Sequence, residues 1–309
     1  MTMTIPRWTP AEIADQSGRT AFITGGNSGI GLETARVLAA HGARVILAGR
    51  SQARLDEAVA GLRAGQPHAR LDTVVVDLGS LASIQAATAR VAATETIDLL
   101  VNNAGIMNVP ERRTTSDGFE LTFGTNHLGH FALTAGLMPA LRRSPAARVV
   151  TVSAIAATWR SGRLDDLMSE RSYGAMTAYA KSKRANVVFT VELARRLAGT
   201  GIQAIVVHPG SAVTNLQRHG AGVLNRLVLA AARRFLMGSP EGAAWPSLYA
   251  ATNPAVRNGQ FIGPAGTDQT AGTPKPVALP KGADDLAEGA SLWTLSERLT
   301  GVRFAVSGD

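Results

Sequence analysis

A tyrosine and a lysine four residues apart, Tyr179 and Lys183, are well suited to proton transfer. The segment "AYAKSKRANVVFTVELARRL" that holds them has a helical pattern without Pro or Gly, so both side chains should share one helix face. A nearby ammonium favours phenolate, which predicts that Tyr179 has a lowered pKa and acts as general acid and base. Lys181 points about 200° away around such a helix, so we interpret it as a solvated or interface side chain.

A serine follows a short apolar run, "VVTVS", at residues 149–153. If the run is a parallel strand, Ser153 lies at its carboxyl end, where open α/β sheets bind ligands. Its hydroxyl is then predicted to hydrogen-bond a substrate oxygen. Taken alone, Ser153 would be an ordinary strand-end serine, and its weight as a candidate comes from Tyr179 and Lys183.

A glycine-rich turn, "TGGNSGIG", follows the apolar run "TAFIT" near the start of the chain. Glycines at such a strand-to-helix junction let backbone N–H groups approach a pyrophosphate at the helix N-terminus. The alternative is a tight turn without a ligand. The predicted cofactor contacts in this turn are Gly25, Asn27, Ser28, Gly29, Ile30 and Gly31.

The end of the second apolar run indicates which dinucleotide is bound. Gly49 stands where an NAD-binding protein usually has an acidic residue, and Arg50 follows it. A guanidinium can hold a ribose 2′-phosphate that a carboxylate would repel, so the sequence favours NADP(H) over NAD(H). The alternative is that Arg50 is one more solvated arginine. Asp77 and Leu78, after the third run, are predicted to lie at the adenine.

The elements expected to position these residues alternate between strand and helix patterns. Short β-branched runs occur at residues 20–24, 43–48, 71–76, 97–101, 147–153 and 202–207, with helical patterns between them. This predicts a single-domain α/β protein with a Rossmann-type, doubly wound parallel sheet of about seven strands. Residues 1–16 are expected to form an extension and 17–263 the catalytic domain, with a lid at 211–237. Residues 264–309 are expected to complete the domain with a surface loop to 289 and a closing helix.

Composition excludes several classes of function. The chain has 309 residues, no cysteine and a net charge of +8, with its arginines spread along the sequence. We therefore expect no thiolate metal site and no nucleic-acid partner. Without a signal peptide or an apolar span, a cytoplasmic location is expected. Membrane contact through the basic, amphipathic residues 222–237 is an alternative.

These motifs together resemble the short-chain dehydrogenase/reductase family. "TGGNSGIG", "NNAG", "NHLGHF", Ser153, "YAKSK" and "HPG" occur in the family's order and spacing. The resemblance implies a catalytic tetrad of Asn126, Ser153, Tyr179 and Lys183, with Asn126 holding a water on a proton path. It also implies that Lys183 bonds the nicotinamide ribose, and it adds cofactor contacts at Asn103, Ala104, Gly105, Pro209, Gly210 and Thr214.

Narrower features resemble the retinol dehydrogenase and protochlorophyllide reductase branch of that family. Ser153 and Tyr179 are 26 residues apart, about twice the usual gap, and the inserted segment resembles that branch's loop. The predicted function is therefore NADP-dependent interconversion of a carbonyl and an alcohol. Apolar residues in the predicted lid suggest a medium-sized hydrophobic substrate, unless they only pack the helix onto the sheet; they are Leu224, Val228, Phe235 and Met237.

Two further alternatives remain at this stage. One is a regulatory or scaffold protein that senses a dinucleotide on the same fold without catalysis; the presence of both Tyr179 and Lys183 speaks against it. The other concerns assembly. The family often pairs subunits through the helices around residues 117–143 and 177–199, which leaves a homo-oligomer open. His208 is interpreted as a strand-end histidine rather than a ligand.

Overall fold

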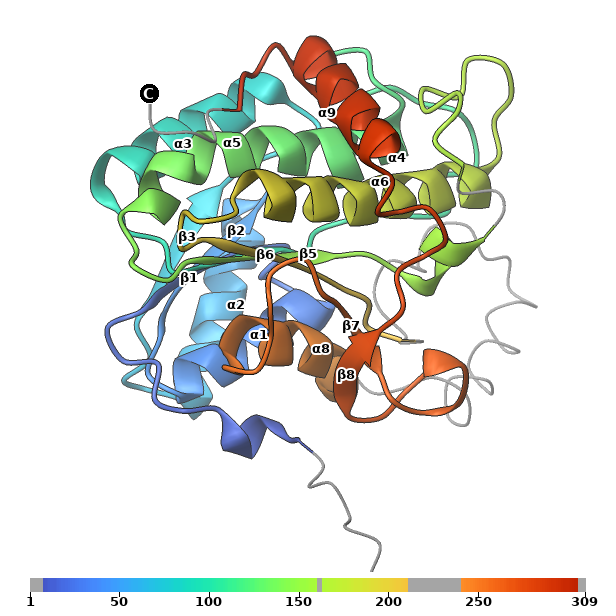
Figure 1. The fold of residues 1–309 in the computed structure, drawn as a ribbon. Coiled ribbons are helices and arrows are strands. Elements are labelled where there is room, and N and C mark those ends of the chain that lie inside the picture. The colour runs from blue at the N-terminus through green and yellow to red at the C-terminus, as the bar shows by residue number, and fades with distance from the viewer. Residues whose placement is uncertain (1–7, 160–162, 211–239, 305–309) are drawn as a thin grey trace, which may run out of the picture.

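A computed structural model of the chain describes residues 8–159, 163–210 and 240–304. In these ranges one sheet of eight strands carries helices on both faces (Figure 1). The strand order is β3-β2-β1-β4-β5-β6-β7-β8, with the direction of progression reversing between β1 and β4. This arrangement confirms the predicted Rossmann-type, doubly wound fold. The strands are β1 (Thr20–Thr24), β2 (Arg44–Gly49), β3 (Leu71–Val75), β4 (Leu99–Asn102), β5 (Arg148–Val152), β6 (Gln203–Val207), β7 (Phe261–Pro264) and β8 (Pro274–Val277).

The last strand departs from the prediction of a loop over residues 264–289. β8 pairs antiparallel with β7, whereas all other neighbouring strands are parallel. Its sequence, "PKPV", has no alternating pattern and two prolines, which cannot donate to a strand ladder. Such a strand is tolerated at the edge of a sheet, which is where β8 lies. The prolines and the missing alternation therefore explain why the sequence pattern did not predict this strand.

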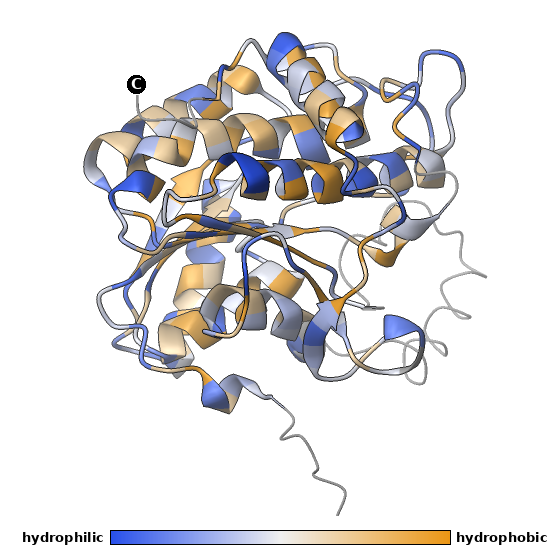
Figure 2. Ribbon diagram, in the orientation of Figure 1, coloured by the Kyte–Doolittle hydropathy of each residue, from blue (hydrophilic) through white to orange (hydrophobic). Residues whose placement is uncertain are grey.

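Two layers of helices bury the sheet. One face packs against α1 (Gly29–Ala40), α2 (Gln52–Gly65) and α8 (Pro240–Thr252), and the other against α3 (Leu81–Thr94), α5 (Gly129–Arg142) and α6 (Ala175–Arg196). The helices turn hydrophobic residues toward the sheet and hydrophilic residues outward (Figure 2). Because both faces are covered, the strands read as nearly continuous apolar runs, which is why their positions were predictable.

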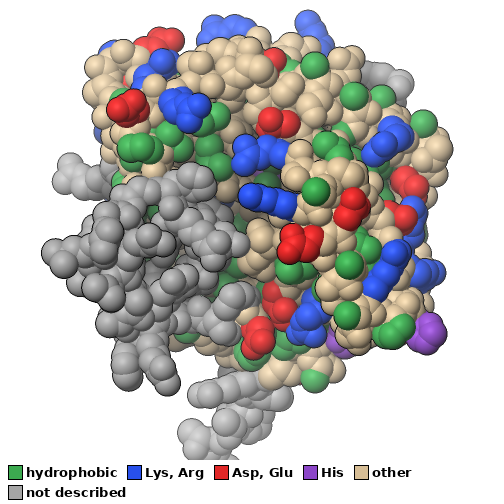
Figure 3. All heavy atoms as spheres, turned by 180° about the vertical axis from the view of Figure 1, so that it is seen from behind, with side chains coloured by type: hydrophobic (Ala, Val, Ile, Leu, Met, Phe, Trp, Pro, Cys, Tyr) green, Lys and Arg blue, Asp and Glu red, His purple; other side chains and the backbone are tan. Residues whose placement is uncertain are grey.

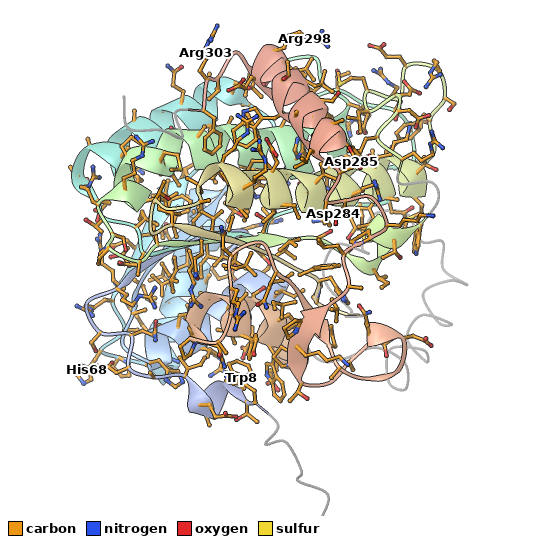
Figure 4. All side chains as sticks on the ribbon, viewed as in Figure 1. Trp8, His68, Asp284, Asp285, Arg298 and Arg303 are labelled. Carbon is orange, nitrogen blue, oxygen red and sulfur yellow. The ribbon has the colours of Figure 1, made fainter. Side chains whose placement is uncertain are left out.

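The closing helix α9 (Leu286–Thr300) lies outside α6 and α5 rather than on the sheet. Asp285 caps its first turn by accepting from the backbone N–H groups of Ala287 and Glu288, and Figure 4 shows Asp285 and Arg298 at opposite ends of the helix. Beneath α9 the rings of Phe131, Phe189, Trp293 and Phe304 pack edge to face and stacked. Subunit pairing through α5 and α6 would therefore have to avoid the area that α9 covers.

The N-terminal segment also packs on the body of the protein. Trp8 is buried, and its ring lies edge-on to Trp245 and Tyr249 of α8, with centroid distances of 6.5 and 5.2 Å (Figure 4). Ile13 is buried beside a short 3-10 turn, η1 (Pro10–Glu12). Trp8 and Ile13 of the expected extension are thus part of the core on the α8 side, while the residues between them are partly or fully exposed.

The described surface is mixed in charge. Lys, Arg, Asp and Glu side chains are interspersed on the face turned away from the viewer of Figure 1 (Figure 3). Among the described helices, none is both long and apolar enough to cross a membrane. The predicted lid at 211–237, with Thr214 and the four apolar residues named for it, lies outside the described residues.

Candidate active site

The glycine-rich turn lies beside the switch point between β1 and β4, where open α/β sheets form a crevice. Gly25 follows β1 with φ +65°, and α1 begins at Gly29 after Ser28 as N-cap. A Cβ on Gly31 would lie 2.4 Å from the Gly25 carbonyl oxygen, so only glycine lets the helix start so close to the turn. Asn27 and Ile30 lie partly exposed in this turn.

The segment after β4 braces the turn through hydrogen bonds to Thr24. The Asn103 side-chain amide donates to the Thr24 carbonyl oxygen at 2.8 Å. The backbone N–H groups of Asn103 and Ala104 both donate to the Thr24 hydroxyl, at 2.9 and 3.0 Å. The structure thus brings the predicted residues Asn103 and Ala104 directly against the predicted glycine turn.

A histidine that the sequence analysis missed completes this brace. His130 Nε2 lies 2.9 Å from the Thr24 hydroxyl, and Nδ1 lies 2.9 Å from the Asn126 carbonyl oxygen. Burial lowers the pKa of His130 to about 4, so the ring is neutral near pH 7. His130 therefore joins the end of β1 to the helix that carries Asn126. The available signal was its spacing of four residues from Asn126, which places both on one helix face.

Asn126 lies in a π-helical turn, η2 (Gly124–Leu128), between the short helix α4 (Leu121–Phe123) and α5. Its side-chain oxygen accepts from the Ile106 N–H at 2.8 Å. Its amide donates to the Ile106 carbonyl oxygen and to the Ser182 hydroxyl, at 2.9 and 3.0 Å. One side chain thus ties the segment after β4 to α6, and π-helical turns of this kind are frequent at functional sites.

Lys183 is buried where α6 crosses the end of β5. Its Nζ donates to the Val152 carbonyl oxygen at 2.9 Å and lies 5.8 Å from the centroid of the Tyr179 ring. A Cβ on Gly105 would lie 3.4 Å from this Nζ and 3.2 Å from the Asn126 side-chain oxygen. The absence of a side chain at Gly105 therefore keeps the space between Lys183 and Asn126 open.

The electrostatics of the pair differ from the sequence prediction. Burial raises the pKa of Tyr179 to about 12 and lowers the pKa of Lys183 to about 8. The prediction that Lys183 lowers the pKa of Tyr179 is therefore wrong for the protein alone, because desolvation of the phenolate outweighs the ammonium. At pH 7 the tyrosine is the protonated, acid form.

Ser153 directly follows β5, as predicted, and is buried. Its hydroxyl donates to the Lys183 carbonyl oxygen at 2.7 Å. The helix α6 lies against the strand end and supplies this acceptor. The structure thus gathers Asn126, Ser153, Tyr179 and Lys183, while the predicted bond from Ser153 to a substrate stays a prediction.

At the far end of the crevice lie the residues expected to select the dinucleotide. A Cβ on Gly49 would lie 3.2 Å from the Asn27 side-chain oxygen, so a larger residue here would crowd the glycine turn. Arg50 is exposed directly after β2. Asp77 lies two residues beyond β3 and accepts from the Gly79 N–H at 2.9 Å, and Leu78 is buried beside it.

The end of β6 is fastened to the loop before β8. His208 Nε2 lies 2.7 Å from the Gln269 side-chain oxygen, and the Gly210 N–H donates to His208 Nδ1 at 3.3 Å. Gly210 has φ +75°, and a Cβ there would lie 2.2 Å from the Thr270 carbonyl oxygen. Pro209 lies between them at the carboxyl edge of the sheet. Among the described residues no group of three or more His, Cys, Asp or Glu is placed to hold a metal ion.

The interpretation of Lys181 as a solvated or interface side chain is wrong. Only 7% of Lys181 is exposed, and its Nζ donates to the Asp166 carbonyl oxygen at 3.1 Å. The segment between β5 and α6 folds back onto this face of α6 and covers it. Helical spacing separated Lys181 from Tyr179 correctly but carried no information on what would pack there.

The fold and the gathered polar residues define an α/β protein of the dinucleotide-binding type, and the comparisons make the class specific. The family model described as short chain dehydrogenase matches residues 19–221. Retinol dehydrogenase 14 of Mus musculus is 38% identical over 299 residues, covering 92% of this chain and 86% of that protein. The chain therefore belongs to the short-chain dehydrogenase/reductase family, whose enzymes are NAD(P)-dependent oxidoreductases.

Two further comparisons extend over most of the chain. Polyprenol dehydrogenase of Mus musculus is 38% identical over 307 residues, covering 94% of this chain and 87% of that protein. A solved structure of an uncharacterized protein from Mycobacterium paratuberculosis has a TM-score of 0.78 at 38% identity, covering 97% of this chain and 99% of the other. Within its family the chain is retinol dehydrogenase-like, as its inserted segment predicted.

Proposed function

We propose that the protein is an NADP(H)-dependent oxidoreductase that interconverts a carbonyl and an alcohol on a medium-sized hydrophobic substrate. The observation that carries the proposal is the convergence of Tyr179, Lys183, Ser153 and Asn126 at the carboxyl ends of β4 and β5, beside the glycine turn. The opposite assignment, a dinucleotide sensor without catalysis, gives no reason to bury a lysine beside a tyrosine at this edge.

Tyr179 is the proposed general acid and base. Its protonated phenol suits carbonyl reduction, because an alkoxide is a stronger base than a phenolate and takes the proton. Lys183, with its pKa of about 8, is mostly an ammonium at pH 7 and stabilises the phenolate left behind. In the reverse direction Tyr179 must first lose its proton, so we expect alcohol oxidation to improve as the pH rises.

The described residues fit a dinucleotide. Gly25 and Gly31 keep the backbone bare at the start of α1, and Gly105 leaves space between Asn126 and Lys183. The predicted contacts along this path remain Asn27, Ser28, Gly29, Ile30, Asp77, Leu78, Asn103, Ala104, Pro209 and Gly210. When bound, the nicotinamide supplies or accepts the hydride. NADP(H) is proposed over NAD(H) because an exposed Arg50 and the crowding at Gly49 leave a cation rather than a carboxylate there.

A hydrophobic substrate is supported by two observations. The large apolar side chains of Trp159 and Met176, at the two ends of the inserted segment, are 43% and 37% exposed. Met176 precedes Tyr179 by three residues, which places them on adjoining positions of α6. The two relatives compared above are named for retinol and polyprenol, which are both isoprenoid alcohols. We therefore propose an isoprenoid or similarly apolar alcohol or aldehyde.

The test is a screen of NADPH oxidation with purified protein over aliphatic, aromatic and isoprenoid aldehydes and ketones, with the reverse alcohol assays beside it. Direct titration with NADPH and NADH measures cofactor affinity separately. Turnover that favours apolar carbonyls and NADPH supports the proposal. Tight NADPH binding without turnover on any carbonyl or alcohol would favour the sensor, and preference for NADH would overturn the cofactor assignment.

A further inference from the structure

The segment between β5 and α6 contains a turn that is held by local hydrogen bonds. We call its residues 163–174 the insert. Asp166 adopts φ +46°, and its carboxylate accepts from the backbone N–H groups of Glu170, Arg171 and Ser172, at 2.8, 3.3 and 3.4 Å. Leu167 and Ser169 are buried beneath this turn. The insert is therefore shaped by local bonds to one carboxylate and attached to the rest of the protein as a unit.

Three side chains attach the insert to the protein around it. The Arg112 guanidinium donates to the Met168 carbonyl oxygen at 3.0 Å, and the Tyr173 hydroxyl donates to the Val109 carbonyl oxygen at 2.6 Å. These two bonds join the insert to the segment after β4, which runs beside it in Figure 1. The third is the bond from Lys181, which joins the folded turn to the helix that carries Tyr179 and Lys183.

Lys181 is an unusual choice for this contact. A buried ammonium loses hydration, and here it has a backbone carbonyl at 3.1 Å and the half-exposed Asp165 carboxylate at 4.0 Å. An apolar side chain of similar length would fill the same space without that loss of hydration. The lysine adds a directional hydrogen bond. This bond fixes the position of the Asp166 carbonyl, and therefore of the turn, relative to α6.

The position of the insert matters for an apolar substrate. The chain outside the insert carries Trp159 before it and Met176 after it, two of the four large apolar side chains that are exposed among the described residues. Trp159 follows η3 (Ile155–Thr158), a 3-10 turn that packs on α6. Tyr179 itself contacts the small residues of that turn and Met107. Met107 is two residues from Val109, whose carbonyl accepts from Tyr173, so the C-terminal end of the insert is attached to the same segment that contacts the tyrosine.

We propose that Lys181 is a positioning residue that holds the insert against α6 as one wall of the substrate cleft, and that it sets the affinity for long apolar substrates without entering the proton transfer. This rests on the function proposed above. It assigns the two lysines separate tasks on opposite faces of one helix: Lys183 acts on the phenol, and Lys181 acts on the wall beside it.

The test compares Lys181→Met, Lys181→Arg and wild type with a long and a short aldehyde, dodecanal and butanal, at saturating NADPH. We expect Lys181→Met to raise KM for dodecanal about tenfold, with kcat, KM for butanal and the Kd for NADPH within twofold. Lys181→Arg keeps a donor for the Asp166 carbonyl and should restore KM for dodecanal. The matched control is Lys275→Met, which changes an exposed lysine of β8 and should behave as wild type.

A second readout does not depend on activity. Arg171 in the insert is highly exposed, so trypsin cleavage after it reports how firmly the insert is held. Lys181→Met should be cut there several-fold faster than wild type or Lys275→Met. Unchanged cleavage and unchanged KM would overturn the positioning role, and so would an equal loss of kcat on both aldehydes. A wild type that reduces no aldehyde would sink the proposed function, while faster cleavage in the variant would still support the attachment of the insert.

Discussion

The glycine turn and the insert sit at the same edge of the sheet but are held in place by different means. At the glycine turn, side chains brace the end of β1, but the turn itself depends on backbone packed against backbone: Gly31 faces the Gly25 carbonyl oxygen at a distance that no Cβ tolerates. At the insert, side chains reach across to carbonyl oxygens, from Arg112, Tyr173 and Lys181. The first kind of contact dictates residue type, and the second permits many substitutes.

This difference matches the two kinds of ligand that we propose, a cofactor common to many enzymes and a substrate that differs between them. A turn fixed by backbone contact can vary little, so it suits a cofactor common to many enzymes. A wall fixed by exchangeable side chains can be re-aimed without disturbing the sheet, so it suits a substrate that differs from one enzyme to the next. The helix α6, which carries the proposed catalytic residues, lies between them, with Lys183 facing one side and Lys181 the other.

The largest expected effect tests the proposed catalytic role of α6. Tyr179→Phe removes the phenolic proton and keeps a ring of the same shape against Met107 and Ala156. We expect kcat to fall about 10²- to 10⁴-fold, the range that general acid-base groups supply. The Kd for NADPH and the melting temperature should stay near those of wild type, measured by titration and calorimetry. A Phe variant that retains most of its turnover would exclude Tyr179 as the proton donor.

A second prediction concerns the free energy of unfolding, which the burial of the Lys183 ammonium should lower. Its pKa is about 8 in the folded protein and 10.5 when unperturbed, because burial disfavours the ammonium. Between these values the unfolded chain holds a proton that the folded protein lacks, so the free energy of unfolding should rise with pH across this window. The shift corresponds to about 3 kcal/mol. Below pH 8 the full penalty is present.

Urea denaturation at several pH values measures this effect. Wild type should gain stability between pH 8 and 10.5 relative to Lys183→Met, which has no charge to bury and should be more stable at pH 7 despite being inactive. Lys275→Met, at an exposed position, should keep the wild-type pH dependence. Parallel curves for wild type and Lys183→Met would show that burial does not perturb this lysine.

Sequence reasoning reached the glycine-turn side more completely than the insert side. The class of sheet followed from the apolar strand runs, and the glycine turn and the Tyr179–Lys183 pair followed from residue spacing, which backbone geometry imposes. The full tetrad came only from the resemblance to a family. The burial of Lys181 and the bridge through His130 did not follow. They depend on which distant segments pack on a helix face, and the spacing along one helix does not contain that information. The sign of the Tyr179 pKa shift failed for the same reason, since desolvation is a property of the packed structure.

Arg50 is the exception on the glycine-turn side, because it is an exchangeable side chain that we propose selects the cofactor. Arg50→Ala should weaken NADPH about 10- to 100-fold, the effect of losing charged hydrogen bonds to a phosphate, and leave NADH unchanged. Titration of both cofactors checks this. Arg54→Ala, an exposed arginine of α2, is the matched control. An equal loss for both cofactors would assign Arg50 a structural role.

The smallest expected effects test whether backbone contact dictates residue type at the glycine turn. Gly31 lies in α1 and Gly61 in α2. By helix propensity alone, replacing either glycine with alanine should stabilise the protein. A Cβ at 31 would lie 2.4 Å from the Gly25 carbonyl oxygen and 2.5 Å from the Asn103 amide nitrogen, whereas a Cβ at 61 meets nothing within 4 Å.

Gly31→Ala should therefore lose about 1–3 kcal/mol of unfolding free energy through overpacking, and NADPH affinity with it. Gly61→Ala should gain about 0.5–1 kcal/mol, because alanine restricts the unfolded chain and exposes less helix backbone. Urea denaturation of both variants measures the two changes in the same units. Opposite signs from one substitution show that the turn, and not glycine's flexibility in general, requires glycine at 31. If both substitutions changed the free energy of unfolding in the same direction, the glycine turn would tolerate a Cβ. The proposed contrast between a turn fixed by backbone contact and an insert held by side chains would then be wrong.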